Sequence, residues 1–197
     1  MAILTVGRSS TGHSRMVRAL VLVLGLASIL GLSVSAQGAT PSREYQVKAV
    51  FLFNFAQFVE WPPAAFSEEN APLAICVLGD DPFGSYLDDV VRGEQVNSRR
   101  LTVQRFRSPD DIKGCQVLFV SKSQNRNLEK ALAAVKGMDA LTVSDADDFA
   151  ERGGMIQLET QNGKIRLRIN VGAAKSASLT ISSKLLRSAE IVASRGD

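Results

Sequence analysis

The sequence predicts an α/β domain: a mostly parallel mixed sheet flanked by helices, with a carboxyl-terminal antiparallel hairpin and a closing helix. Two observations support this fold class. Between residues 73 and 144, short apolar runs alternate with helical stretches, which is typical of parallel strands joined by crossover helices. Further along, an Asn-Gly pair separates two runs of alternating apolar and polar residues, and this pattern is a strong signal for a hairpin.

The amino-terminal segment has the three regions of an export signal. Arg8, Arg15 and Arg18 make it basic, residues 19–32 form an apolar run, and small residues lead up to Ala36. A membrane anchor is the alternative, but a helix of about 14 residues spans only about 21 Å, less than the roughly 30 Å hydrocarbon core. We therefore expect cleavage near Ala36 and a periplasmic product. The expected organisation is a cleaved signal over 1–36, a short polar lead over 37–43, a single domain over 44–193 and a flexible tail over 194–197.

Loss of the signal changes both the charge of the chain and the chemistry left in it. The signal carries three arginines and no acid, out of 23 basic and 20 acidic residues, so the mature chain is neutral. A neutral chain lacks the basic surplus expected of a nucleic-acid-binding protein. The only histidine, His13, is removed as well, which excludes histidine-dependent nucleophiles and the usual zinc sites. We therefore expect no enzyme activity, with carboxylate chemistry or chemistry at Lys184 as the remaining alternative. We also expect no cofactor and no nucleic acid partner.

The first helix is predicted over residues 44–60. Thr40, Pro41 and Ser42 supply a helix start, and Trp61 followed by two prolines ends it. Apolar side chains cover most of the helix, so it is buried on more than one side, by its own domain or by a partner. The apolar positions are Val47, Ala49, Val50, Phe51, Leu52, Phe53, Phe55, Ala56 and Phe58. The candidate partner or dimer interface consists of Phe51, Phe53, Phe55, Phe58, Trp61 and Phe66.

The remaining elements follow in chain order, each predicted from its periodicity. Apolar or alternating runs predict strands over residues 73–79, 101–106, 115–120 and 140–144. Helical stretches cover residues 85–92, 127–135 and the acidic segment 145–151, which ends at the Gly153-Gly154 turn. The hairpin pairs residues 155–160 with residues 164–171, and the closing helix covers residues 182–193.

Both cysteines lie in apolar runs that are predicted to be buried strands. An even cysteine count in an exported protein favours a disulfide, and Cys76 and Cys115 pair in only one way. Closing a loop of about forty residues stabilises a fold by roughly 4 kcal/mol in the chain-entropy model. Two separate buried thiols are the alternative, and no Cys-x-x-Cys spacing points to redox chemistry.

Two groups of charged residues are candidates for a ligand or anion pocket. Asp80 and Asp81 follow a predicted strand, at the edge where open α/β sheets commonly bind ligands, although Asp81-Pro82 also has the pattern of a helix cap. The Gly-rich segment around them does not match a dinucleotide fingerprint. The second group has a solvated polar face as its alternative, and consists of Arg166, Arg168, Lys184 and Arg187.

Two further features at predicted strand and helix ends bear on function. Ser182-Ser183-Lys184 lacks the serine three residues before lysine that a serine-lysine nucleophile requires, so helix capping is the better interpretation.

The alternative to a protein-binding role is a periplasmic small-molecule sensor, with its ligand at the carboxyl ends of the parallel strands near Asp80, Ser121 and Ser144.

Four segments together resemble the YfiR family of periplasmic regulators, in order and in spacing. The first is Phe51 to Pro62, with its Trp-Pro ending, and the second joins Cys76-Val77-Leu78-Gly79 to Asp81-Pro82-Phe83-Gly84. The third joins Gly153-Gly154-Met155-Ile156 to Arg168-Ile169-Asn170, and the fourth is Ile181 to Leu186. The resemblance covers residues 44–193.

The resemblance implies a repressor that binds the periplasmic sensing part of an inner-membrane diguanylate cyclase and lowers cyclic-di-GMP signalling and biofilm formation. It also implies a homodimer, and an outer-membrane lipoprotein that relieves repression by sequestering the repressor. Cys76 and Cys115 match one family disulfide. The second family bridge has no cysteines here, which puts redox sensing through a second pair in doubt.

Overall fold

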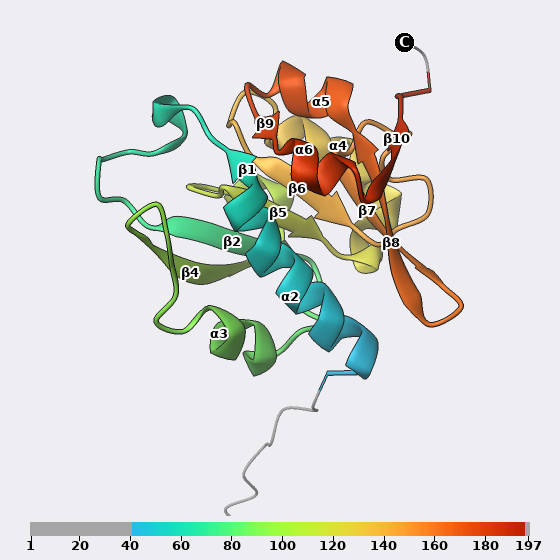
Figure 1. Ribbon diagram of the computed structural model, residues 1–197, viewed down its shortest axis with the longest axis horizontal. Coiled ribbons are helices and arrows are strands. Elements are labelled where there is room, and N and C mark those ends of the chain that lie inside the picture. The colour runs from blue at the N-terminus through green and yellow to red at the C-terminus, as the bar shows by residue number, and fades with distance from the viewer. Residues whose placement is uncertain (1–40, 196–197) are drawn as a thin grey trace, which may run out of the picture. The chain divides into compact units, whose positions relative to one another are not determined.

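The computed structural model describes residues 41–195, and within that range it forms an eight-stranded sheet in the order β10-β8-β7-β6-β5-β2-β4-β3 (Figure 1). The strands of this sheet are β2 (Leu73–Leu78), β3 (Gln95–Val96), β4 (Arg99–Phe106), β5 (Val117–Val120), β6 (Leu141–Ser144), β7 (Ile156–Gln161), β8 (Lys164–Asn170) and β10 (Ala189–Val192). A second, two-stranded sheet pairs β1 (Val59–Glu60) with β9 (Thr180–Ile181).

The helices are α2 (Arg43–Phe58), α3 (Ser85–Val91), α4 (Leu128–Ala134), α5 (Val171–Ser176) and α6 (Ser183–Leu186). Short 3-10 turns cover Pro63–Ala65, Pro109–Asp111 and Lys122–Asn127. The start of α2 is the predicted one, because the Ser42 hydroxyl accepts a hydrogen bond from the Tyr45 backbone N–H at 3.5 Å.

The predicted fold class is confirmed. Five neighbouring strands of the sheet run parallel, in the order β4, β2, β5, β6 and β7. Next to them, β8 is antiparallel to β7, and β10 is parallel to β8. Every residue of β2, β5 and β6 is buried, because helices cover both faces of this central part, as parallel strands require.

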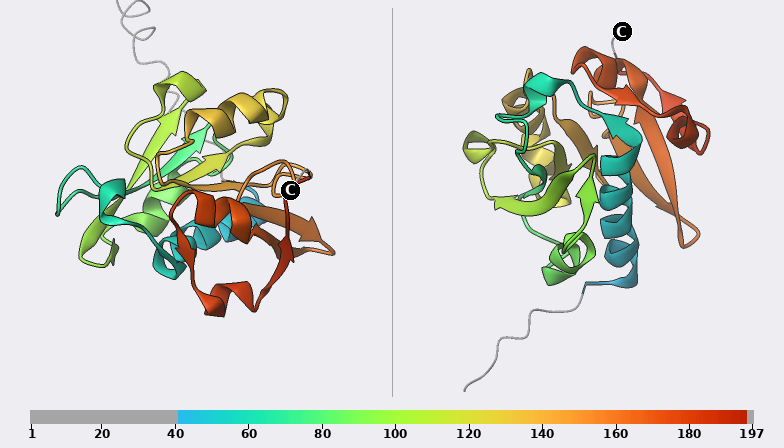
Figure 2. Two further views of the ribbon diagram at one scale, coloured as in Figure 1. Left: turned by 90° about the horizontal axis from the view of Figure 1, so that it is seen from above. Right: turned by 60° about the vertical axis from the view of Figure 1, so that its left-hand side comes forward.

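Two apolar cores lie on the two faces of the sheet. The core on one face joins α2 and α3 to alternate residues of the strands, including Ile75, Val117 and Ile156. The other core packs α4 and both cysteines against Leu118 and the opposite side of β2. Figure 2 shows α2 and α4 on opposite sides of the sheet. The amino-terminal helix is therefore one outer layer of the molecule.

The hairpin is confirmed in position, and its turn has the backbone angles of type I′. Asn162 and Gly163 join β7 to β8 with φ angles of 50° and 72°, and two consecutive positive φ values are what a type I′ turn requires. Gly153 has a φ of 97° in the predicted glycine turn. A Cβ on Gly154 would lie 2.1 Å from the Phe149 ring, so this second glycine is required by close packing.

The acidic segment and the end of the first helix differ from the predicted helices. The acidic segment 145–151 forms turns and no helix, because Asp148 has a φ of 57° and a left-handed residue interrupts a right-handed helix. The first helix ends at Phe58, and Val59–Glu60 becomes β1, because β9 offers these two residues a partner for backbone hydrogen bonds.

The closing helix is present but shorter than predicted. Only Ser183–Leu186 is helical, with the Ser182 hydroxyl accepting from the Lys184 N–H as its cap. Residues 189–192 form β10 at the edge of the sheet, because β8 would otherwise leave its outer backbone groups unpaired.

The predicted signal over 1–36 lies outside the described residues. Within residues 41–195, no helix has the length and apolar character needed to cross a membrane.

Candidate functional site

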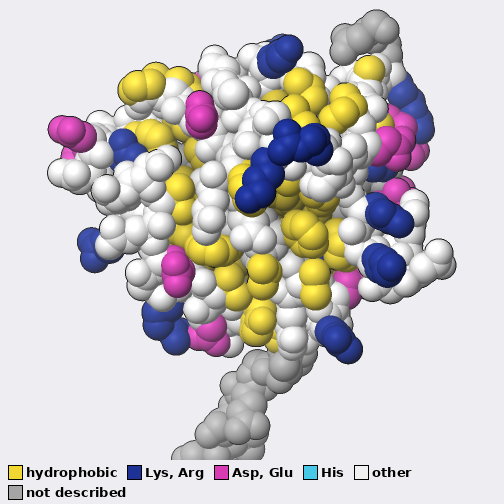
Figure 3. Space-filling view, in the orientation of Figure 1, with side chains coloured by type: hydrophobic (Ala, Val, Ile, Leu, Met, Phe, Trp, Pro, Cys, Tyr) yellow, Lys and Arg dark blue, Asp and Glu magenta, His cyan; other side chains and the backbone are white. Residues whose placement is uncertain are grey.

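The outer surface of α2 is apolar and partly open to solvent. Val47 is 43% exposed and Val50 is 41% exposed, and Phe51, Phe53 and Phe58 are only partly buried. Figure 3 shows apolar side chains gathered over α2 on this face of the molecule. Its own domain therefore covers one side of the apolar helix and leaves the other side partly open. Burial of the open side by a partner stays a prediction.

One residue of the candidate interface lies on the domain-facing side of α2. Phe55 is 0% exposed and belongs to the core together with Ala49, Leu52 and Ala56. Phe55 therefore cannot contact a partner, and its place in the candidate interface was wrong. The buried face of the helix therefore lies away from the exposed face that carries Val47 and Val50.

A buried ion pair holds α2 against the carboxyl end of β6. Lys48 is 1% exposed, and its ammonium lies 2.6 Å from Oδ2 of Asp145, whose side chain is equally buried. Asp145 directly follows β6. The Tyr45 hydroxyl donates to the same carboxylate oxygen at 2.9 Å, and Lys48 also pairs with Glu44 one turn earlier in the helix. The buried charges of Lys48 and Asp145 are therefore paired with each other, as burial requires.

The electrostatics of this cluster follow from its burial. Hydrogen bonds from Lys48 and from the Thr160 hydroxyl lower the pKa of Glu44. Burial, and then the charge of Asp145, raise the pKa of Tyr45. The Lys48 ammonium also lies 4.6 Å from the centre of the Tyr45 ring. Asp145 Oδ1 is buried and has no hydrogen-bond partner among the described residues.

Sequence reasoning missed the Lys48 cluster, although one signal for it was present. Lys48 lies four residues before Leu52 and seven before Phe55, so the helical period places it in line with two core residues. Its partner Asp145 lies 97 positions away in sequence, and no local pattern connects the two. Val47 and Val50 belong to the predicted apolar stripe but not to the candidate interface.

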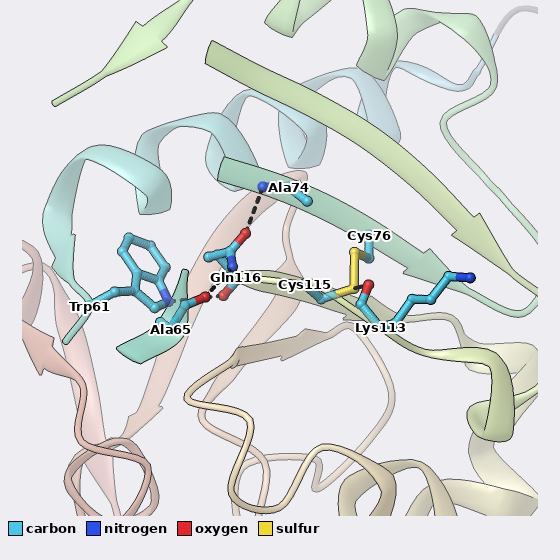
Figure 4. The surroundings of a disulfide bond; sticks show 7 residues. All are labelled: Trp61, Ala65, Ala74, Cys76, Lys113, Cys115 and Gln116. Carbon is cyan, nitrogen blue, oxygen red and sulfur yellow. Dashed lines mark hydrogen bonds between the residues drawn. A yellow bond between two sulfur atoms is a disulfide. The ribbon is translucent and has the colours of Figure 1, made fainter. Parts of the chain in front are cut away.

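The Trp-Pro corner at the end of α2 is fastened to the sheet through Gln116 (Figure 4). The Trp61 indole N–H donates to the Gln116 carbonyl oxygen at 3.1 Å, and the Gln116 side-chain amide donates to the Ala65 carbonyl at 2.7 Å. The Gln116 side-chain oxygen accepts from the Ala74 N–H at 2.8 Å. Trp61 is therefore held in one position, with its ring only partly buried.

Phe66 lies beyond this corner and is covered on one side by a cation. The Arg99 guanidinium lies 3.7 Å from the centre of the Phe66 ring, and the same side chain donates to the Ala71 carbonyl at 2.7 Å. Trp61, Phe66 and Arg99 line a small cavity of about 200 Å³. Trp61 and Phe66, the two residues of the candidate interface outside α2, therefore line the same cavity.

The structure joins the two cysteines in a disulfide. Cys76 lies in β2 and Cys115 precedes β5, with their Cα atoms 6.0 Å apart. Both residues are buried in the core that contains α4, on the sheet face opposite α2. Gln116 directly follows Cys115, so the disulfide and the Trp-Pro corner share one short segment (Figure 4).

The two acidic residues of the candidate pocket lie at the end of β2 and are paired with arginines. Asp81 accepts from the Arg105 guanidinium at 2.6 Å and from the Phe83 N–H at 2.8 Å. Asp80 lies 3.6 Å from the guanidinium of Arg107. The expected helix cap at Asp81 is a turn instead, because Gly84 is the N-cap of α3.

The four cations of the candidate pocket lie around β8 and α6. Arg168 is paired with Glu151 at 2.7 Å, and Lys184 lies 5.4 Å from the centre of the Phe58 ring. Arg166 and Arg187 line one cavity of about 730 Å³. Three strands separate β2 from β8, a distance of roughly 19 Å at the usual strand spacing. The structure therefore does not bring the acidic and basic groups together.

The serines of the small-molecule alternative are used within the fold. The Ser144 hydroxyl donates to the Val120 carbonyl at 2.6 Å and accepts from the Ala146 N–H at 3.0 Å. The Ser121 hydroxyl accepts from the Ser123 N–H at 3.4 Å. Within the described part of the chain, no group of three or more histidine, cysteine, aspartate or glutamate side chains is placed to hold a metal ion.

Comparison with known proteins identifies a family. No curated protein matches the chain. One similar solved structure is the ABC domain in complex with L-Trp from Streptococcus pneumonia, at 10% sequence identity and a TM-score of 0.46, with 61% of this chain and 55% of that chain covered. This likeness is too distant to bear on fold or function. The family model described as YfiR/HmsC-like matches residues 45–190. The chain therefore belongs to the YfiR/HmsC-like family.

Proposed function

We propose that this protein is a periplasmic regulator that binds the periplasmic sensing part of an inner-membrane diguanylate cyclase and represses it. Repression lowers cyclic-di-GMP signalling and biofilm formation. Membership of the YfiR/HmsC-like family supports this proposal. The protein acts by occupying a surface of the cyclase and catalyses no reaction. Homodimer formation and sequestration by an outer-membrane lipoprotein belong to the same proposal.

The observation that carries the proposal is the open apolar side of α2. Val50 is 41% exposed, and an apolar surface of this kind on an exported domain is typical of a protein-binding site. The Lys48–Asp145 pair and the Gln116 hydrogen bonds hold the helix and the Trp61 corner in one arrangement. A surface that is already ordered loses little entropy when it binds.

The test replaces one exposed apolar side chain and compares it with a matched control. Val50→Glu places a charge on α2, whereas Met138→Glu places one at a residue of similar exposure, 40%, that follows α4 on the other side of the sheet. We expect Val50→Glu to abolish recovery of the membrane cyclase in a periplasmic pull-down and to raise cyclic-di-GMP. Met138→Glu should behave as wild type.

The same experiment can contradict the proposal. If the folded wild-type protein recovers no diguanylate cyclase and its deletion leaves cyclic-di-GMP unchanged, the regulatory function is wrong. If Val50→Glu represses as fully as wild type, the function stands and the α2 surface is the wrong one.

A further inference from the structure

A groove runs beside the amino-terminal half of α2. It lies between this helix and the β7–β8 hairpin and has a volume of about 510 Å³. We propose that this groove binds an acidic, apolar segment of a partner protein. The inference rests on the proposed function, for which it names the chemistry of the partner. The groove is lined by Arg43, Glu44, Val47, Phe51, Thr160, Gly163, Lys164 and Ile165.

The walls of the groove are apolar. Val47 is 43% exposed, and Phe51 from the helix and Ile165 from β8 are only partly buried against the core. These three side chains come from two elements that the Lys48–Asp145 pair and the sheet hold in place. Covering them removes apolar surface from water, which favours an apolar occupant.

The charges around the groove favour an acidic occupant. Arg43 and Lys164 are exposed, and neither forms an ion pair with any residue in the described range 41–195. The only acidic side chain in the lining, Glu44, is already engaged by Lys48 and by the Thr160 hydroxyl.

Two other occupants fit these features less well. In a two-fold dimer formed through this groove, the same patch of both copies would meet, so Arg43 and Lys164 of one copy would approach those of the other. Like charges brought together in this way oppose association. A bilayer with anionic headgroups would satisfy the cations but would not fill a groove, whereas the side chains of a protein segment enter one.

The experiment uses the isotope-labelled mature protein and two synthetic peptides of equal length. One peptide is built from leucine, serine and glutamate, and the other has lysine in place of glutamate. We expect the acidic peptide to shift the amide resonances of residues 43–51 and 160–165, and the basic peptide to leave them unchanged. Phosphatidylglycerol vesicles are tested in parallel as the membrane alternative.

Charge-reversal variants make the result specific. We expect Lys164→Glu to weaken binding of the acidic peptide by roughly threefold, which is the usual scale of one exposed ion pair. We expect the double variant Arg43→Glu with Lys164→Glu to bind the basic peptide instead of the acidic one. The matched control is Arg100→Glu, an exposed residue on β4, far from β8 in the strand order, and it should leave binding unchanged. Trp61 fluorescence verifies that each variant is folded.

Several outcomes would overturn the proposal. These are no binding of the acidic peptide at concentrations up to about 1 mM, equal binding of both peptides, resonance shifts away from the groove, or stronger shifts with the vesicles. The cyclase assay above is independent of this one. Peptide binding without repression would overturn the proposed function alone, and repression without peptide binding would overturn the groove alone.

Discussion

Replacing Lys48 with methionine tests how α2 is held on the sheet. The change keeps the length of the side chain but leaves the Asp145 carboxylate, with its side chain 1% exposed, without its cation. Breaking a buried ion pair from one side usually costs about 3–5 kcal/mol, because a buried charge remains uncompensated. The second pair of Lys48, with the half-exposed Glu44, adds only about 0.5 kcal/mol. We therefore expect a loss of about 3–5 kcal/mol.

The assay is urea unfolding followed by the fluorescence of Trp61, the only tryptophan of the chain. The slope of the transition should stay the same while the midpoint falls. Combining Lys48→Met with Asp145→Asn should cost about 2 kcal/mol less than the sum of the two single changes, because the pair is coupled. A loss below about 1 kcal/mol for Lys48→Met, or strict additivity, would refute the idea that this pair fastens the helix.

Three further predictions address stability and its dependence on pH. Cys115→Ser should lower the free energy of unfolding by about 2–5 kcal/mol, and reduction of the Cys76 bridge in the wild type should have a similar effect in the same urea assay. The pKa of Glu44 is lowered, so its contribution is complete above its ordinary value of about 4.3 and is lost as the pH falls through its lower folded value. Glu44→Gln should therefore flatten the loss of stability below about pH 4, and an unchanged pH profile would contradict this. Gly154→Ala should cost about 1–3 kcal/mol through overpacking, because its Cβ would overlap a buried ring. The control Gly172→Ala, whose new Cβ lies 3.4 Å from its nearest neighbour, should change stability by less than about 1 kcal/mol, and equal costs would refute the packing argument.

Local patterns sufficed for the elements whose causes are local. The Asn162-Gly163 turn could be predicted because both residues tolerate the positive φ that the hairpin requires. The parallel sheet followed from short apolar runs separated by helical stretches. Residues 189–192 show the limit of such patterns. They continue a helical stretch in the sequence, but the open edge of β8 draws them into a strand.

For the candidate site, the sequence determined the composition and the tertiary structure decided the orientation. The sequence alone showed that the first helix is apolar nearly all round, that the chain has two cysteines, each in an apolar run, and that its only histidine, His13, lies in the predicted signal. It could not say which side of the helix stays open, since a helix without a clear polar face has no preferred rotation. The contact between Lys48 and Asp145, which are 97 residues apart in the sequence, fixes the rotation of α2 against the sheet. It buries Phe55 and leaves Val47 and Val50 exposed, because a lysine enters a core only where its charge is matched.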